Sequence, residues 1–360
     1  MPNSTNWRLY ADNKDAWYDM LNDCAAAKES IVLEQFIFMN DEFGQKMLNI
    51  CANRAAEGVE VRFLWDAAGS FTFWGSNVAE DLRKKGIELV FWKTLVPGYF
   101  SLVNFRSWYF RNHRRTLVID GKVGYTGSLC VDDRFKNWRD TNVRVEGTVV
   151  SQMKNAFERM WARARQQNKL PKRILLPRLA EFKYVTNYPT PGRRQIYSGL
   201  LKALRQAESC IYITTPYFVP THRLVRTIKA AAKRGVHVRL IIPEKSDHYA
   251  VDLAARAYFH SLLQAGVQIF LYSGNMIHSK AIIVDGTWAT VGSMNLDSAS
   301  LLYNFEANLV TTNDRFANEL AEHFITDLKD SKPVNAAEWQ NRFFLEKIPE
   351  ILIRLVTRFL

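Results

Sequence analysis

The feature that most constrains this fold is an internal duplication. Residues 31–38 resemble residues 211–219, and the glycine-terminated helix and strand around Gly58 resemble those around Gly235. The copies are 180 positions apart in the first case, from 31 to 211, and 177 in the second, from 58 to 235. A third pair of segments repeats at the same distance. A spacing this regular indicates two copies of one folding unit.

Each copy alternates helices with apolar strands, and glycine ends the helices. This alternation predicts an α/β fold of two similar lobes, each a mixed sheet flanked by helices. The predicted divisions are a first lobe over residues 1–168, a linker over 169–192, a second lobe over 193–330 and a C-terminal amphipathic segment over 331–360. Two copies of a half-site favour a pseudo-twofold arrangement with the active site at the lobe interface.

Both copies carry one motif: a histidine, a cation two residues later, an apolar strand, Asp-Gly, and then Gly-Ser. In the first copy the side chains are His113, Arg115, Asp120 and Ser128. In the second they are His278, Lys280, Asp285, Ser293 and Asn295. Residues two apart on a strand face the same way, and Asp-Gly predicts a hairpin turn. The hairpin would return Gly-Ser to the histidine end, where hydroxyls and backbone N–H groups can bind phosphate.

The paired motif predicts phosphodiester chemistry. A histidine can attack phosphorus or protonate a leaving alkoxide, while cations stabilise the equatorial oxygens. We expect no metal and no cofactor, because two histidines suffice. Asp140 and Glu306 lie at matching distances downstream and are expected to hydrogen-bond the histidines; Asp140 alone would read as a surface charge. Asp120 and Asp285 are counted among the catalytic candidates, but turn stabilisation is the favoured interpretation of both.

The net charge of +12 predicts an acidic partner: nucleic acid, anionic lipid or a phosphate substrate. Four cysteines without metal-binding spacing predict free thiols in a reducing compartment. No apolar run approaches the roughly 20 residues of a membrane span, and residues 1–10 lack a signal-peptide pattern. A soluble or membrane-peripheral protein is expected.

Two segments favour a lipid partner. Between the histidine motifs the distance falls to 165, from 113 to 278, so the first copy holds extra residues. The surplus lies around residues 95–110, which are rich in aromatic residues and arginine, as suits a membrane interface. Residues 343–360 alternate apolar clusters with basic residues. The alternatives are a loop packed over the core and a helix docked on the protein.

The motifs resemble the phospholipase D superfamily, whose signature is HxKxxxxD followed by Gly-Ser or Gly-Gly and often Asn. The resemblance implies two phospholipase D-like lobes with the site between them. It also implies a covalent phosphohistidine on His113, with His278 as general acid and then base. Family geometry further implies cross-pairing of Glu306 with His113 and of Asp140 with His278. Segments similar to the bacterial cardiolipin synthase branch are residues 34–38, 139–147, 215–220 and 245–248.

That branch implies transfer of a phosphatidyl group between phospholipids, with phosphatidylglycerol as an example of donor and acceptor. The alternatives are phospholipid hydrolysis, a nuclease-like phosphodiesterase, and a non-catalytic lipid-binding protein. Two positions depart from the signature: Arg115 replaces lysine, and Cys130 stands where the second copy has Asn295. The expected partners are an anionic phospholipid membrane and its lipids, without nucleic acid, on the cytoplasmic side of a bacterial cell membrane. Self-association is left open.

Overall fold

The computed structural model describes residues 5–92, 110–175, 177 and 180–342. Two segments predicted to meet lipid therefore lie outside the described residues: the aromatic insert, except for Phe110, and residues 343–360. Among the described residues, no helix combines the length and the apolar character needed to cross a membrane. All four cysteines are free, as predicted.

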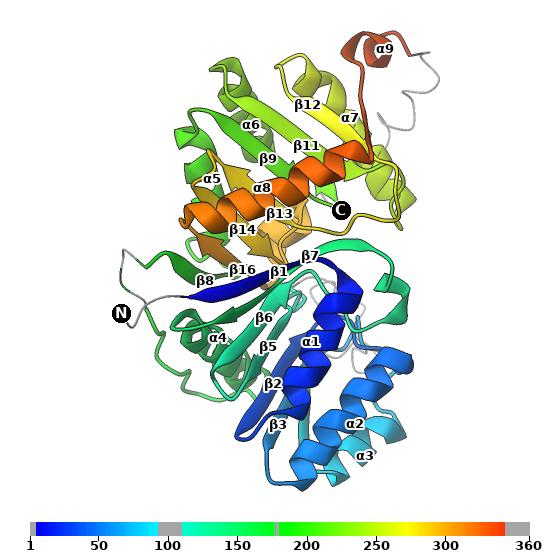
Figure 1. Cartoon of the computed structure of the whole chain (residues 1–360), viewed down its shortest axis with the longest axis vertical. Coiled ribbons are helices and arrows are strands. Elements are labelled where there is room, and N and C mark those ends of the chain that lie inside the picture. Colours follow the sequence, from blue (N-terminus) through cyan, green and yellow to red (C-terminus); the bar gives the residue numbers. More distant parts are fainter. Residues whose placement is uncertain (1–4, 93–109, 176, 178–179, 343–360) are drawn as a thin grey trace, which may run out of the picture.

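The first lobe is built on a seven-stranded mixed sheet (Figure 1). Its strands are β1 (Asn6–Asp12), β2 (Ser30–Gln35), β3 (Glu60–Asp66), β4 (Ile87–Trp92), β5 (Thr116–Ile119), β6 (Val123–Gly127) and β7 (Arg139–Glu146). Its helices are α1 (Asn13–Ala25), α2 (Glu42–Ala56), α3 (Asn77–Lys84) and α4 (Val149–Ala164), with a 3-10 turn, η2, at Asp133–Phe135. The strands run in the order β1-β7-β6-β5-β2-β3-β4, and β2, β3 and β4 are parallel.

The second lobe repeats this plan on an eight-stranded sheet. Its strands are β8 (Phe182–Asn187), β9 (Cys210–Thr214), β11 (His237–Pro243), β12 (Gln268–Tyr272), β13 (Ala281–Val284), β14 (Trp288–Gly292), β16 (Glu306–Thr311) and β17 (Ser331–Pro333). Its helices are α5 (Gln195–Gln206), α6 (His222–Lys233), α7 (Tyr249–Leu263), α8 (Asp314–Lys329) and α9 (Ala336–Gln340), with a π-helical turn, η3, at Ala299–Tyr303. A small parallel pair joins β10 (Phe218–Val219) to β15 (Leu296–Asp297).

The order β8-β16-β14-β13-β9-β11-β12 reproduces the first sheet strand for strand, and β17 is added at its edge. The duplication and the two-lobed α/β fold are therefore confirmed. The counterpart of β1 is β8, which lies inside the predicted linker, residues 169–192, and pairs with β16. The second sheet thus starts before residue 193, and β17 carries it past residue 330.

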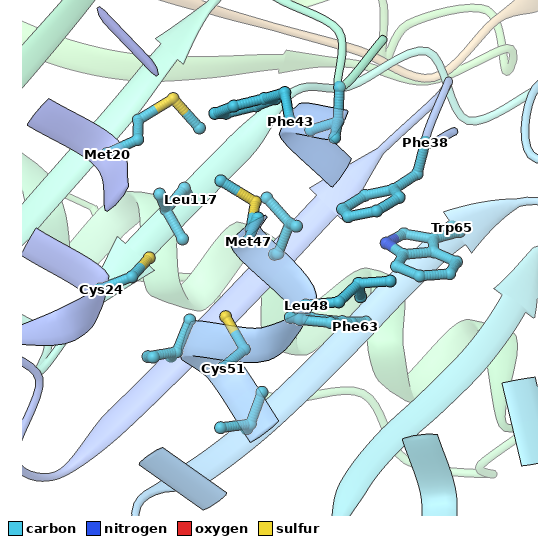
Figure 2. Close-up of a cluster of buried hydrophobic side chains, with 14 of the residues drawn as sticks. Met20, Cys24, Phe38, Phe43, Met47, Leu48, Cys51, Phe63, Trp65 and Leu117 are labelled. Carbon is cyan, nitrogen blue, oxygen red and sulfur yellow. The ribbon is translucent and has the colours of Figure 1, made fainter. Parts of the chain in front are cut away.

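Each sheet buries one face under its own helices, and a third core joins the lobes. Figure 2 shows the first of these cores, where Met20 and Cys24 on α1 approach Met47 and Cys51 on α2 above the sheet. The joining core contains Val143 and Phe157 from the first lobe and Leu309 and Phe316 from the second. Because this core is continuous, it fixes one lobe against the other, and residues at the junction can be positioned from both sides.

Candidate active site

The Asp-Gly turns form as predicted but lie away from the histidines. Asp120 and Asp285 both have φ of +53°, the left-handed conformation of such turns. The Asp120 carboxylate accepts N–H bonds from residues 28–30, and that of Asp285 accepts them from residues 208–210. A four-residue strand, about 13 Å long, separates each aspartate from its histidine. These contacts support the turn-stabilising interpretation of Asp120 and Asp285 and speak against their inclusion among the catalytic candidates.

The segment that carries each histidine pairs with a strand of the opposite lobe. The backbone N–H of His113 donates to the carbonyl of Phe305 over 3.0 Å, and that of His278 donates to Arg139 over 2.8 Å. Glu306 directly follows Phe305, and Asp140 directly follows Arg139. These reciprocal bridges bring each histidine to a carboxylate from the other half of the chain.

The carboxylates hold the inner ring nitrogens. His113 Nδ1 lies 2.9 and 3.1 Å from the two oxygens of Glu306, and His278 Nδ1 lies 3.2 Å from Asp140 Oδ2. Both carboxylates are fully buried, while the His113 side chain is 12% exposed and that of His278 is 5% exposed. The structure thus has the cross-pairing implied by the resemblance.

A cation faces the outer nitrogen of each histidine. Arg115 Nη2 lies 3.0 Å from His113 Nε2, and Lys280 Nζ lies 3.0 Å from His278 Nε2. A guanidinium can only donate, so Nε2 of His113 must present its lone pair, which leaves the ring proton on Nδ1 facing Glu306. That tautomer is the one a nucleophilic histidine needs.

The Gly-Ser segments arrive beside the carboxylates, as the hairpins predicted. The Ser128 hydroxyl donates to Asp140 Oδ1, and the Ser293 hydroxyl donates to Glu306 Oε2. Both serines are fully buried. Asn295 is buried, and its Oδ1 lacks a hydrogen-bond partner in the described residues. The serines therefore orient the carboxylates, whereas Asn295 keeps an acceptor available.

Burial and the two cations keep both histidines neutral. Burial, with the charges of Arg115 and Lys280, lowers the pKa of His113 well below its usual range. Burial and Lys280 lower the pKa of His278 to about 4. Burial and Arg115 also lower the pKa of Lys280 to about 7. Each cation also lowers the pKa of the histidine in the other motif, so the two cations and the two histidines must lie around a common space. An anion bound in that space would relieve the repulsion between the cations.

Comparison with known proteins identifies this arrangement. A family model described as "Cardiolipin synthase, PLD-like domain" matches residues 20–161 and 200–328. A cardiolipin synthase of Clostridium perfringens (strain SM101) is 32% identical over 366 residues, which is 97% of this chain and 76% of that protein. One from Listeria monocytogenes serotype 4b is 33% identical over 362 residues, 97% of this chain and 74% of the relative.

The chain belongs to the cardiolipin synthase family of the phospholipase D superfamily. It is therefore an enzyme of that superfamily. Solved structures agree on the fold: phosphatidylserine synthase of Haemophilus influenzae has a TM-score of 0.73 at 15% identity, covering 98% of this chain and 92% of that one. Polyphosphate kinase of Porphyromonas gingivalis has a TM-score of 0.62 at 10% identity, covering 99% and 54%.

Several residues around the site were not among the candidate site residues that the sequence indicated. Aromatic rings form its walls: Phe36 meets His113 edge-on at 4.9 Å between centroids, and Trp138 meets His278 at 5.4 Å. Two buried carboxylates brace the backbone before His113. The Asp66 carboxylate accepts from the guanidinium of Arg111, and the Glu34 carboxylate accepts from Asn112 Nδ2 over 2.8 Å. Only the unbroken polar run of residues 111–115, which places polar side chains on both faces of the segment, could have indicated this bracing.

Arg115 stands where the second copy of the motif has Lys280, and the structure links that departure to Cys130. Arg115 Nε lies 3.3 Å from Cys130 Sγ, and the cysteine is fully buried. Arg115 also donates from Nη1 to the carbonyl of His113 over 2.9 Å, as Lys280 does to His278 over 2.8 Å. The longer side chain thus reproduces the lysine contacts, and the small thiol leaves room for it. We therefore expect the two departures to compensate for each other.

Restoring one family residue alone should therefore be harmful. We expect Cys130→Asn to crowd Arg115 and lower kcat about tenfold or more, and Arg115→Lys beside Cys130 to leave a gap. The double variant should recover most of the activity, with a coupling of about 1–2 kcal/mol in a double-mutant cycle. Activity assays on the four proteins measure this coupling. Strictly additive losses would show that the two side chains act independently.

Glu306 should make stability depend on pH. Burial raises the pKa of Glu306 to about 8, above its unfolded value, so the folded state favours the protonated acid. Stability from this group is complete below the unfolded pKa, about 4.3, and falls as pH rises toward 8. The free energy of unfolding of Glu306→Gln, relative to that of the wild type, should therefore rise by up to about 1.4 kcal/mol per pH unit between pH 5 and 8. Urea unfolding at several pH values measures this, and a constant difference would contradict it.

Proposed function

We propose that the enzyme transfers phosphatidyl groups between phospholipids at a membrane surface, making cardiolipin from two molecules of phosphatidylglycerol. The observation that carries the proposal is the reciprocal site. Each histidine lies between a carboxylate at Nδ1 and a cation at Nε2, and the two cations face one place. The family relationship supplies the substrate class, because the curated relatives are named cardiolipin synthases.

In the first step Nε2 of His113 attacks the phosphorus of the donor lipid. The bond from phosphorus to the head-group oxygen breaks, a phosphorus–nitrogen bond forms, and glycerol leaves with a proton from His278. Arg115 and Lys280 stabilise the charge on the equatorial oxygens. The two contacts from Glu306 and the braced backbone before His113 favour His113 as the nucleophile.

Substrate binding prepares His278 to be the acid. In the free enzyme, burial and Lys280 keep His278 neutral. A phosphate diester between Arg115 and Lys280 brings a negative charge that offsets both cations, so it raises the pKa of His278. Burial opposes ionisation of Asp140, but His278, Lys280 and Ser128 together hold its pKa below the usual value. Asp140 is therefore an anion that stabilises the imidazolium.

In the second step His278 accepts a proton from the glycerol hydroxyl of an acceptor phosphatidylglycerol. The resulting oxygen attacks phosphorus, the phosphorus–nitrogen bond breaks, and cardiolipin forms with His113 restored. Water in place of the acceptor gives phosphatidate, so hydrolysis differs from transfer only in the nucleophile. The second candidate function, phospholipid hydrolysis, therefore needs no other residues.

Lipid analysis by mass spectrometry tests the proposal. Purified enzyme is incubated with phosphatidylglycerol vesicles beside the His113→Ala and His278→Ala variants. Cardiolipin and glycerol in equal amounts, absent from both variants, is the expected result. Formation of phosphatidate without cardiolipin would show that the enzyme is a hydrolase and not a transferase. Absence of any lipid product from the wild type, also with phosphatidylethanolamine or added alcohols, would overturn the proposal.

A further inference from the structure

One short stretch of the second lobe carries most of the excess positive charge. Residues 191–235 contain nine Lys and Arg residues and a single acid, Glu208, a difference of +8 within a chain of net charge +12. The nine cations are Arg193, Arg194, Lys202, Arg205, Arg223, Arg226, Lys229, Lys233 and Arg234. They lie on α5, on α6 and on the segments that flank these helices, and we call this set the α5–α6 basic surface (Figure 1).

The cations of this surface are not neutralised within the described chain. None of the nine forms an ion pair there, whereas other arginines such as Arg62, Arg139 and Arg144 pair with carboxylates. Arg194 and Arg234 donate to backbone carbonyls. Six of the other seven are exposed, and Lys229 is half-buried. Unpaired cations concentrated on one surface create a field that attracts an anionic partner.

A cleft opens within this surface. It has a volume of about 400 Å³ and is lined by residues of the turn before α5 and of both helices. Its cations are Arg194, Arg205 and Arg223, and no carboxylate lines it. Tyr197 and Thr221, whose hydroxyl oxygens lie 2.5 Å apart, join the start of α5 to the start of α6. The cleft therefore combines three guanidinium groups with polar and apolar walls, a fitting environment for a phosphate on an amphiphile.

The cleft is also close to the reaction centre. The N-terminus of α5 is bound by Asn187, whose Oδ1 accepts the N–H of Ile196 over 3.0 Å. Asn187 pairs in register with Glu306, the carboxylate that holds His113. The neighbouring Tyr188 packs on Phe305 with 5.6 Å between ring centroids. The start of α5, which lines the cleft, is thus bonded to the strand that pairs with the strand of Glu306.

We propose that the α5–α6 basic surface docks on an anionic phospholipid bilayer, with lipid phosphates entering the cleft of Arg194, Arg205 and Arg223. The inference rests on the proposed function for the class of lipid. Docking here holds the enzyme on the bilayer that supplies its donor and acceptor, beside the site that uses them. Nucleic acid is also an anion and would be attracted to the same surface. Nothing at the reaction centre requires nucleic acid, and the experiment below includes it as a competing ligand.

The test uses a charge-reduced variant and a matched control. The variant combines Lys202→Gln, Arg205→Gln, Arg223→Gln and Arg226→Gln. The control removes four exposed lysines elsewhere: Lys14→Gln, Lys28→Gln, Lys85→Gln and Lys169→Gln. Sedimentation with vesicles of phosphatidylglycerol and phosphatidylcholine measures binding at two salt concentrations. A cation near an anionic surface contributes about fivefold in affinity, so removing four should weaken vesicle binding by up to about 600-fold. The control should lose much less of its affinity for the vesicles.

Kinetic assays separate docking from chemistry. Turnover of a dispersed short-chain phosphatidylglycerol should be unchanged in the variant, while turnover on vesicles falls. All binding measurements are repeated in the His113→Ala background, so docking is observed even if no lipid product forms and the proposed function fails. Unchanged vesicle binding by the variant, or an equal loss in the control, would overturn the proposal. So would a variant that loses binding to single-stranded DNA but keeps binding to vesicles.

Discussion

Replacing His113 with alanine should abolish phosphatidyl transfer, with kcat reduced about 10⁴-fold or more, as is typical when a covalent nucleophile is removed. In the described structure, the imidazole of His113 is the group that lies between Glu306 and Arg115. Neither of these two groups is a nucleophile for phosphorus. The measurement is cardiolipin formation from phosphatidylglycerol vesicles, followed by mass spectrometry.

The control for this variant is His260→Ala, an exposed histidine on α7. Thermal unfolding of both variants shows whether the fold is kept. Loss of activity with an unchanged melting temperature, and normal activity in His260→Ala, is the expected pattern. Substantial residual transfer in His113→Ala would assign the covalent step to another group.

The second large effect concerns His278. With natural donors, kcat of His278→Ala should fall about 10³-fold because the leaving alkoxide is no longer protonated. A donor with a p-nitrophenol head group needs no such proton. His278→Ala should therefore release a burst of about one equivalent of p-nitrophenol at close to the wild-type rate and then stall, because His278 is also the base of the second step, while His113→Ala should show no burst. Absorbance of the released p-nitrophenolate measures both.

The same assay can refute the assignment of roles. If His113→Ala were rescued by the activated donor and His278→Ala were not, the two histidines would have exchanged roles. If neither were rescued, His278 would be needed for more than proton donation, for instance for positioning phosphate.

The sequence predicted the duplicated α/β architecture because matching helix–strand units recur at a fixed distance. It could not predict that β8 is the counterpart of β1. Both are edge strands whose place is determined by pairing with β7 and β16, a long-range contact that leaves no local pattern. Residues 169–192 were therefore all expected to form a linker, whereas the second sheet already starts at Phe182.

Within the site, spacing indicated His113, His278 and their cations, since one motif occurs twice. The cross-pairing with Glu306 and Asp140 came from the resemblance alone, because no local rule shows which half of the chain supplies a partner. Asp-Gly is a turn signal, so the sequence already favoured a turn role for Asp120, although the motif also placed it among the catalytic candidates. The packed rings of Phe36 and Trp138, and the bracing carboxylates, arise only from tertiary structure.

Trapping the covalent enzyme tests the central claim most directly. His278→Ala is mixed with the p-nitrophenol donor and quenched in denaturant at alkaline pH, where a phosphorus–nitrogen bond to histidine survives. Peptide mass spectrometry then locates the adduct. We predict a phosphatidyl group on the peptide that contains His113, and none when His113 is also replaced. An adduct on another residue, or turnover without any adduct, would contradict a mechanism in which His113 carries the phosphatidyl group.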